Sequence, residues 1–341
     1  MKEPKYINLY ACCIPVKGYS RSTICDVQKG QYKLIPNTMF EIITLHNNKT
    51  IEEIKKTYTN SYDKIIDEYI EFLLKNELAF LTDEPELFPK IDLNWESTSI
   101  ISNAIIDIDS ISNHDFHVVF SSLDDLNCKA VQLRFFSVIS IIELEKILEH
   151  SKTGKLRTIE LLLSYNDSID SSEIEKMCKK YQRISEVVIH SSPFNSTANI
   201  LENIGGVFLT FLSEKILANS HCGQIHPSNF NTNIQMFTES QKHNTCLNGK
   251  ISIDINGDIK NCPSMSKTYG KLDNIKLKDV VEKPEFKDLW FINKEQVEVC
   301  KDCEFRHICT DCRAYIQDAD NIYSKPIKCG YNPYINKWED S

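Results

Sequence analysis

The chain has 341 residues, a formal net charge of −9, 41% hydrophobic residues and 10% aromatic residues. At roughly 150 residues per domain this length predicts two or three domains, and the composition excludes a disordered chain. The negative charge argues against nucleic acid and anionic membranes as partners, because both bind basic surfaces. The N-terminal sequence has charges, a proline and no long apolar run, so we expect neither a signal peptide nor a membrane span, and a cytoplasmic location.

The first region, residues 1–90, is predicted to be a small winged-helix-like module. β-Branched and aromatic residues indicate short strands within 6–16 and 22–35. Three helices follow: the second begins at a capping box of Thr50 and Glu53, and the third has apolar residues at helical spacing. The sequence LAFLT would then return as a strand.

Three uses of this module stay open. DNA binding is disfavoured because Asp63, Asp67, Glu68 and Glu71 make the longest helix acidic. Peptide capture by strand addition is the second, in which backbone hydrogen bonds supply affinity and side-chain pockets supply specificity. The third is an ordinary packing domain without a ligand.

The second region, residues 98–215, alternates short apolar runs with amphipathic helical stretches. This alternation predicts a parallel βα architecture, in which catalytic residues lie at the carboxyl ends of the strands. Those ends hold Asp109, Arg134, Tyr165 and His190, which form no recognisable catalytic set. We expect Asp109 and His190 to be satisfied loop or surface residues. The chain also lacks the glycine-rich motifs that cradle nucleotide phosphates.

The third region, residues 216–341, holds eight of the thirteen cysteines, of which Cys222 lies near its start. The other seven form the patterns C-x10-G-x4-C and C-x2-C-x5-C-x2-C, followed by one more cysteine. These residues are Cys246, Cys262, Cys300, Cys303, Cys309, Cys312 and Cys329. Asn256-Gly257 predicts a hairpin that brings Cys246 and Cys262 near each other. The loop-like sequence from Cys300 to Cys312 is typical of a module that metal ligands hold together.

The cysteine spacing favours iron–sulfur ligation over zinc or metal-free thiols. A chain that is not exported keeps its thiols reduced, and thirteen is an odd number, so disulfides are disfavoured. Cys303 and Cys309 are too close in sequence for two zinc knuckles, whereas three nearby cysteines plus a distant one hold many cubane clusters. The five cysteines of the first two regions are expected to be small core residues: Cys12, Cys13, Cys25, Cys128 and Cys178.

The seven-cysteine pattern resembles the SPASM domain, which carries auxiliary clusters in radical SAM peptide-modifying enzymes. The resemblance covers about residues 221–332 and implies two [4Fe-4S] clusters. One cluster would be held by Cys246, Cys262 and Cys312, and the other by Cys300, Cys303, Cys309 and Cys329. Cys222 is the tentative fourth ligand of the first cluster, ahead of His221, His226, His243 or an open site for substrate. One departure is visible, because the run ends C-x2-C at Cys312 where the family has C-x3-C.

A radical SAM enzyme also needs C-x3-C-x2-C after its first barrel strand, and this sequence contains no such motif. The corresponding loop reads SISNHDF, and the strand AVQLRFF lacks the Gly-Gly-Glu motif of that superfamily. The expected fold class is therefore α/β, with a degenerate partial radical-SAM-like βα barrel between the winged-helix-like module and the cysteine-rich SPASM domain. We expect no reductive cleavage of S-adenosylmethionine.

Over nearly the whole chain the sequence resembles the SPASM-domain peptide maturases of grasp-with-spasm systems. The matching motifs are LYACCIPVKG, STICD, HCGQI, CLNGKISIDINGDIKNCPSM and CKDCEFRHICTDC. The resemblance implies an accessory maturation protein that binds a ribosomally made precursor peptide and works with a separate ATP-grasp ligase. Two alternatives stay open: an active redox enzyme that uses an auxiliary cluster, and a redox-sensing regulator.

Overall fold

The computed structural model describes residues 5–167 and 169–339. The chain forms two compact units, each assembled from separate segments. The terminal unit comprises Met1–Glu96, Ile225–Thr245 and Ile292–Ser341, and the sheet unit comprises Ser97–Gln224 and Cys246–Phe291. The predicted third region thus contributes segments to both units. The three-region division stays a prediction, and residues 1–4 and 340–341 of its outer regions lie outside the described residues.

The sheet unit is built on an eight-stranded sheet with the order β10-β11-β9-β8-β7-β6-β12-β13. Its strands are β6 (Asn103–Ile108), β7 (Ala130–Phe135), β8 (Thr158–Ser164), β9 (Ile184–His190), β10 (Ser196–Ile200), β11 (Val207–Phe211), β12 (Lys250–Ile253) and β13 (Ile259–Lys260). The inner strands pair in parallel, whereas β10 and β13 pair antiparallel at the two edges. This largely parallel sheet confirms the α/β class.

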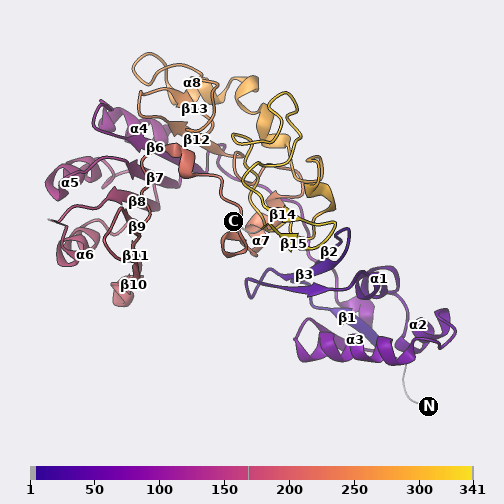
Figure 1. The fold of residues 1–341 in the computed structure, drawn as a ribbon. Helices are drawn as coiled ribbons and strands as arrows, with labels where there is room; N and C mark the ends of the chain where they lie inside the picture. Colours follow the sequence, from indigo (N-terminus) through magenta and orange to yellow (C-terminus); the bar gives the residue numbers. More distant parts are fainter. Residues whose placement is uncertain (1–4, 168, 340–341) are drawn as a thin grey trace. The chain divides into compact units, whose positions relative to one another are not determined.

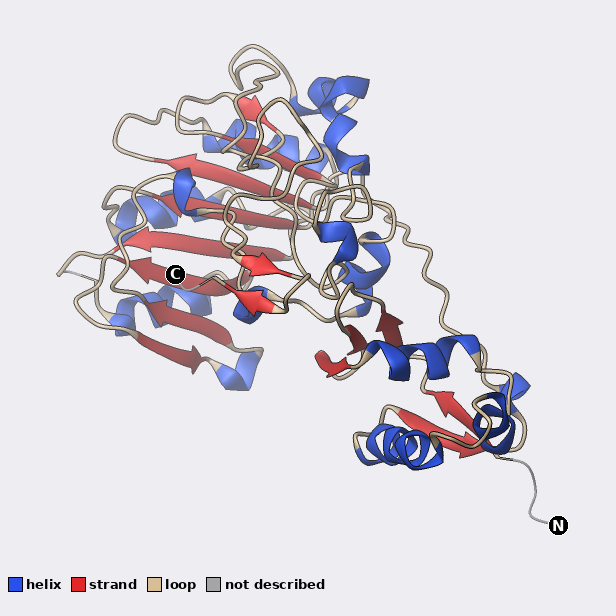
Figure 2. Cartoon of the chain, turned by 45° about the vertical axis from the view of Figure 1, so that its right-hand side comes forward, coloured by secondary structure: helices blue, strands red, loops and turns tan. Residues whose placement is uncertain are grey.

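Helices α4 (Phe116–Asp125), α5 (Ile141–Glu149), α6 (Ser171–Lys180) and α8 (Leu277–Val281) belong to the same unit. The first three connect consecutive parallel strands and lie along one face of the sheet (Figures 1 and 2). Asp115, Ser140 and Asp170 cap them by accepting backbone N–H hydrogen bonds in the first turn. Their apolar faces pack on the sheet around fully buried side chains such as Leu133 and Leu144.

The hairpin between β12 and β13 forms around Gly257, whose φ is 78°, as Asn256-Gly257 predicted. The sequence did not indicate that β12 would also pair in parallel with β6. This pairing places the segment from Cys246 to Cys262 in the sheet unit, beside strands that lie far away in sequence. These strand pairings do not by themselves identify a partial radical SAM barrel, so that part of the expected fold stays a prediction.

The N-terminal part of the terminal unit has the predicted order of strands, three helices and a strand. Its elements are β1 (Tyr6–Leu9), β2 (Cys13–Val16), β3 (Ser22–Asp26), β4 (Gln31–Ile35), α1 (Asn37–Leu45), α2 (Ile51–Thr57), α3 (Asp63–Lys75) and β5 (Ala79–Thr82). β1 pairs with β5, and β2, β3 and β4 form a separate antiparallel sheet. The capping box is present: Thr50 Oγ1 accepts from the Glu53 N–H at 3.2 Å, and Glu53 Oε2 accepts from the Thr50 N–H at 2.8 Å.

The C-terminal part of the terminal unit has little regular structure, namely α7 (Ile234–Glu239), a 3₁₀ turn η7 (Cys300–Asp302), β14 (Tyr331–Asn332) and β15 (Lys337–Trp338). It packs on β2–β4 through a core that includes Cys25, Phe237 and Phe305. Arg21 Nε donates to Glu304 Oε1 at 2.7 Å, and Thr23 Oγ1 donates to the Glu304 carbonyl at 2.9 Å. Within the described residues, no helix is long and apolar enough to cross a membrane.

Candidate metal centres

Four of the predicted ligands line one small cavity in the terminal unit. Cys300, Cys303, Cys309 and Cys329 surround about 20 Å³ of space, together with Lys294 and a shell of aromatic side chains. Cys300 and Cys309 are buried, Cys303 and Cys329 are half-buried, and all four are free thiols. The structure therefore brings together the four cysteines that the resemblance assigned to one cluster.

Lys294 is a feature of this cavity that the sequence did not reveal. It is 6% exposed, and its Nζ donates to Cys309 Sγ at 3.1 Å. Burial lowers the pKa of Lys294, but the negative charges of Cys309, Cys300 and Asp311 outweigh that effect and raise the pKa. A buried ammonium is costly without a counter-charge, so the site is suited to an anionic thiolate group.

The donor set of this cavity fits a thiophilic metal group. Its lining offers four sulfur atoms and no carboxylate, and thiolates select zinc and iron–sulfur clusters rather than magnesium or calcium. Burial raises the pKa of Cys300 to about 11, so metal binding must displace its proton. A space of about 20 Å³ holds little more than one water molecule. A cluster would therefore push apart the side chains that now fill the cavity.

A second set of three cysteines, Cys222, Cys246 and Cys262, lies in the sheet unit. Burial raises the pKa of Cys262 to about 12, and the charges of Cys246 and Cys222 act in the same direction, so the three groups lie within electrostatic range. Lys250 on β12 donates to Cys246 Sγ at 3.6 Å. Burial lowers the pKa of Lys250, but all three cysteines raise it and prevail. Each cysteine set thus has its own lysine.

Arg134 adds a second cation to the set in the sheet unit. Asp107 on β6 is the direct cross-strand neighbour of Arg134 on β7, and Arg134 Nε and Nη2 donate to its two carboxylate oxygens at 2.6 and 2.9 Å. Arg134 Nη1 donates to Cys222 Sγ at 2.7 Å. Burial lowers the pKa of Arg134, but Asp107 and Cys222 raise it further, so the guanidinium stays charged. The tentative ligand Cys222 is therefore held by a buried ion pair.

The other sequence candidates are distributed as follows. Cys312 is buried in the terminal unit, whereas Cys246 and Cys262 belong to the sheet unit, so its place in their cluster stays a prediction. His221 lies 3.5 Å from Glu214, and His226 faces Ser228 at 2.8 Å. His226 and His243 belong to the terminal unit. Their roles as weaker ligands are likewise untested predictions.

The carboxyl ends of the parallel strands hold structural contacts. His190 is fully buried, with Nε2 3.1 Å from the Phe135 carbonyl and Nδ1 3.0 Å from Ser191 Oγ, so it is satisfied but is not at the surface. Asp109 Oδ1 accepts from the backbone N–H groups of Ile111 and Ser112. Both residues are satisfied as expected, and the loop after β6 is closed by its own hydrogen bonds.

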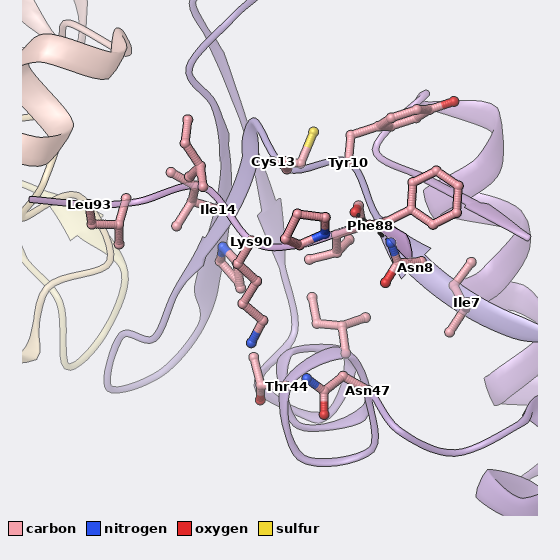
Figure 3. A pocket seen from close by; sticks show the side chains of 16 residues that line it. Ile7, Asn8, Tyr10, Cys13, Ile14, Thr44, Asn47, Phe88, Lys90 and Leu93 are labelled. Carbon is pink, nitrogen blue, oxygen red and sulfur yellow. Dashed lines mark hydrogen bonds between the residues drawn. The ribbon is translucent and has the colours of Figure 1, made fainter. Parts of the chain in front are cut away.

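The N-terminal part of the terminal unit carries a groove of about 290 Å³. Its walls come from β1, the turn after it, β2, the end of α1 and the segment 88–93 (Figure 3). The consecutive residues Ile7, Asn8 and Leu9 all line it, although side chains alternate between the faces of a strand. The groove therefore runs along the edge of β1. Lys90 is the charged residue in its lining.

The chain matches no known family profile and no curated protein. Among solved structures it is similar to SuiB of Streptococcus suis bound to S-adenosylmethionine, with a TM-score of 0.32 and 11% identity over 90% of this chain and 96% of that one. SuiB bound to its precursor peptide SuiA gives a TM-score of 0.34 and 10% identity over 94% and 98% of the two chains. The likeness is loose at these values.

Proposed function

We propose that this chain is an accessory maturation protein for a ribosomally made peptide. In this proposal the terminal unit captures the precursor, and the two cysteine sets hold [4Fe-4S] clusters. A separate ATP-grasp ligase performs the ATP-dependent step, since the sequence has no phosphate-binding motif of its own. The observation that carries the proposal is the cavity formed by four cysteines and the buried Lys294.

In this proposal, different residues of the terminal unit bind the cluster, balance its charge and exclude water from it. Cys300, Cys303, Cys309 and Cys329 would supply four thiolates, and the ammonium of Lys294 would offset their charge. The Phe305 N–H lies 3.4 Å from Cys303 Sγ and would stabilise that thiolate. Phe305, Tyr331 and the other aromatic residues exclude water from the cavity. Such a cluster supplies one-electron redox chemistry or structural cross-linking.

The cluster assignment is tested by anaerobic reconstitution of the full chain with iron and sulfide. We expect Cys303→Ser to lose about half of the bound iron, because it disables one of two clusters. Cys128→Ser is the matched control, since Cys128 is a buried thiol that belongs to neither cysteine set and donates to the Ala130 carbonyl. Protein that takes up zinc and holds no iron would overturn the assignment.

The groove along β1 supports peptide capture by strand addition. β1 pairs with β5 on one side. Its other edge is bridged to Thr50 at Tyr6, so the stretch Ile7–Leu9, which lines the groove, is the part that we propose for an added strand. The lining is mostly apolar, with Asn8, Thr44 and Asn47 as polar groups and Lys90 as a cation. Such a groove suits an extended peptide with apolar side chains and an acidic residue.

Peptide capture is tested by titrating the full chain against synthetic precursor peptides encoded beside its gene. Thr44→Trp fills the groove from α1 and should weaken binding at least about tenfold, or about 1.4 kcal/mol. Leu45→Trp is the matched control, since Leu45 is 70% exposed and does not line the groove. Equal affinities for the two variants would contradict the assignment. Co-expression of precursor and ligase, with and without this chain, then tests whether peptide modification depends on it.

A further inference from the structure

The compact group formed by Cys12, Cys13 and Asp26 lies outside both cysteine sets. Among the described residues, it is the one group of three potential metal ligands whose ligand atoms all lie within 4.8 Å of one another. Both cysteines were expected to be core residues from their strand-like sequence. Cys13 is indeed 3% exposed, but Cys12 is half-buried and reachable from solvent.

The backbone holds the three side chains in place. Cys13 and Asp26 are direct partners across β2 and β3, and the Val27 N–H donates to the Cys12 carbonyl at 2.9 Å. Asp26 Oδ1 accepts from the N–H groups of Gln28 and Lys29 at 3.1 and 2.9 Å, which fixes the carboxylate in the turn after β3. The donors therefore converge without any rearrangement of the chain.

Among the described residues, the Asp26 carboxylate has backbone hydrogen bonds but no ion-pair partner, and the charge of Lys29 acts on Asp26 and Cys13 only at longer range. Asp26 is 4% exposed, and burying a carboxylate is costly unless it is paired. Lys29, on the same turn, pairs with Glu77 at 2.6 Å instead. Within the described part of the chain, no lysine, arginine or histidine lies within 4.0 Å of the Asp26 carboxylate as an ion-pair partner. A divalent cation would supply the missing positive charge.

We propose that Cys12, Cys13 and Asp26 form a site for a single divalent cation of the zinc class. Two sulfur donors and one carboxylate oxygen suit zinc or cobalt rather than magnesium or calcium. Binding releases the protons of both thiols, and the two thiolates and the carboxylate occupy three positions of a tetrahedron. Three protein ligands leave a fourth position for water or an incoming donor.

The site adjoins the groove of the terminal unit, because Cys13 contributes to the groove's lining. The Cys13 sulfur points away from Lys90, so the bound cation and that ammonium do not compete for one space (Figure 3). An ion here would cross-link β2 and β3, the strands that pack on the C-terminal cysteine loop. The inference concerns a mononuclear site and is independent of the clusters.

The test is alkylation of the full chain by N-ethylmaleimide with and without zinc, with each cysteine quantified by peptide mass spectrometry. Reading each thiol separately distinguishes this site from the C-terminal cysteines. At a free zinc concentration ten times the Kd, labelling of Cys12 should fall about tenfold. Cobalt should in addition give sulfur-to-metal charge-transfer absorption, and Cys12→Ser should remove the part of it that this site contributes.

Asp26→Asn keeps the turn hydrogen bonds but weakens the donor set, so most of the protection by zinc should disappear. Asp109→Asn is the matched control, since Asp109 accepts the same kind of turn hydrogen bonds in the other unit. Unchanged labelling of Cys12 on adding zinc to the wild-type chain would overturn the proposal. Equal protection of Cys12 by zinc in Asp26→Asn would also overturn it. So would a Cys12–Cys13 disulfide whose thiols, once reduced, are labelled equally with and without zinc. The wild-type measurement decides even where Asp26→Asn fails to fold.

Discussion

Asp107→Asn is the most direct test of how the sheet unit holds Cys222. The substitution keeps the size of the side chain but removes its charge, so Arg134 loses its counter-ion. The side chains of Arg134 and Asp107 are 5% and 1% exposed, which leaves solvent little access to screen or replace the lost interaction. The buried guanidinium would then keep the hydrogen bond of 2.7 Å to Cys222 Sγ but no carboxylate partner.

The expected loss of stability follows from the geometry of the pair. Two hydrogen bonds of 2.6 and 2.9 Å join the guanidinium to the carboxylate. Removing one partner of such a buried pair typically costs about 3–5 kcal/mol, because the other charge stays desolvated. The asparagine carbonyl can still accept one of the two hydrogen bonds, so we expect a loss of about 3 kcal/mol. For a unit of this size, that corresponds to a fall in melting temperature of roughly 6–12 °C.

Amide hydrogen exchange of peptides from β6 and β7 is the suitable assay, because it reports on the sheet unit alone. Glu175→Gln is the control: it breaks a 2.7 Å pair with Lys179 whose side chains are about half exposed, and it should cost less than about 0.5 kcal/mol. The double variant Asp107→Leu/Arg134→Met should recover most of the lost stability, since it leaves no buried charge unpaired. A loss below about 1 kcal/mol for Asp107→Asn would refute the reasoning.

Three further outcomes follow from single side chains. In the reconstituted protein, Lys294→Met should lower the midpoint potential of the cluster by roughly 60 mV or more, a tenfold change for one electron, because reduction then adds negative charge without a nearby cation. An anaerobic redox titration measures this, and Lys276→Met, at an exposed position, should leave the potential unchanged. Thr50→Ala removes the capping box and should cost about 1 kcal/mol in urea unfolding, against almost nothing for the exposed Thr59→Ala. Leu133→Ala opens a cavity in the core of the sheet unit and should cost about 2–5 kcal/mol, measured by thermal unfolding.

Local signals explain most of what the sequence predicted correctly. Thr50 and Glu53 lie within one helical turn, and the hairpin turn needs a positive φ at Gly257, which glycine adopts readily. The alternation of apolar runs and amphipathic stretches likewise predicted the parallel sheet, because each βα step is nearly self-contained. In these cases the determining residues are close in sequence, so one chain without relatives was sufficient.

Long-range pairing explains what the sequence did not reveal. The parallel pairing of β12 with β6 joins residues far apart in the chain, and the sequence of neither strand indicates which strand it pairs with. The same applies to Arg134, which was predicted at a strand end but without Asp107, and to Lys294, which lies at no fixed spacing from the cysteines that it faces. Buried cations beside thiolates are set by tertiary structure and have no sequence motif.

Sulfur spacing separates the two kinds of metal site that this chain offers. A tetrahedral zinc ion with Zn–S bonds of about 2.3 Å holds its sulfur atoms about 3.8 Å apart, whereas a cubane cluster places four iron atoms between its thiolates and spreads them further. Of the described residues, Cys12, Cys13 and Asp26 meet the compact criterion of 4.8 Å, and no three of the thiols of Cys300, Cys303, Cys309 and Cys329 do. A single ion in the latter site would have to draw the cysteine loop inward against Phe305 and Tyr331, which already fill the cavity wall. The wider sulfur spacing therefore favours a cluster, which enters once the surrounding side chains move apart, and the compact spacing favours one ion.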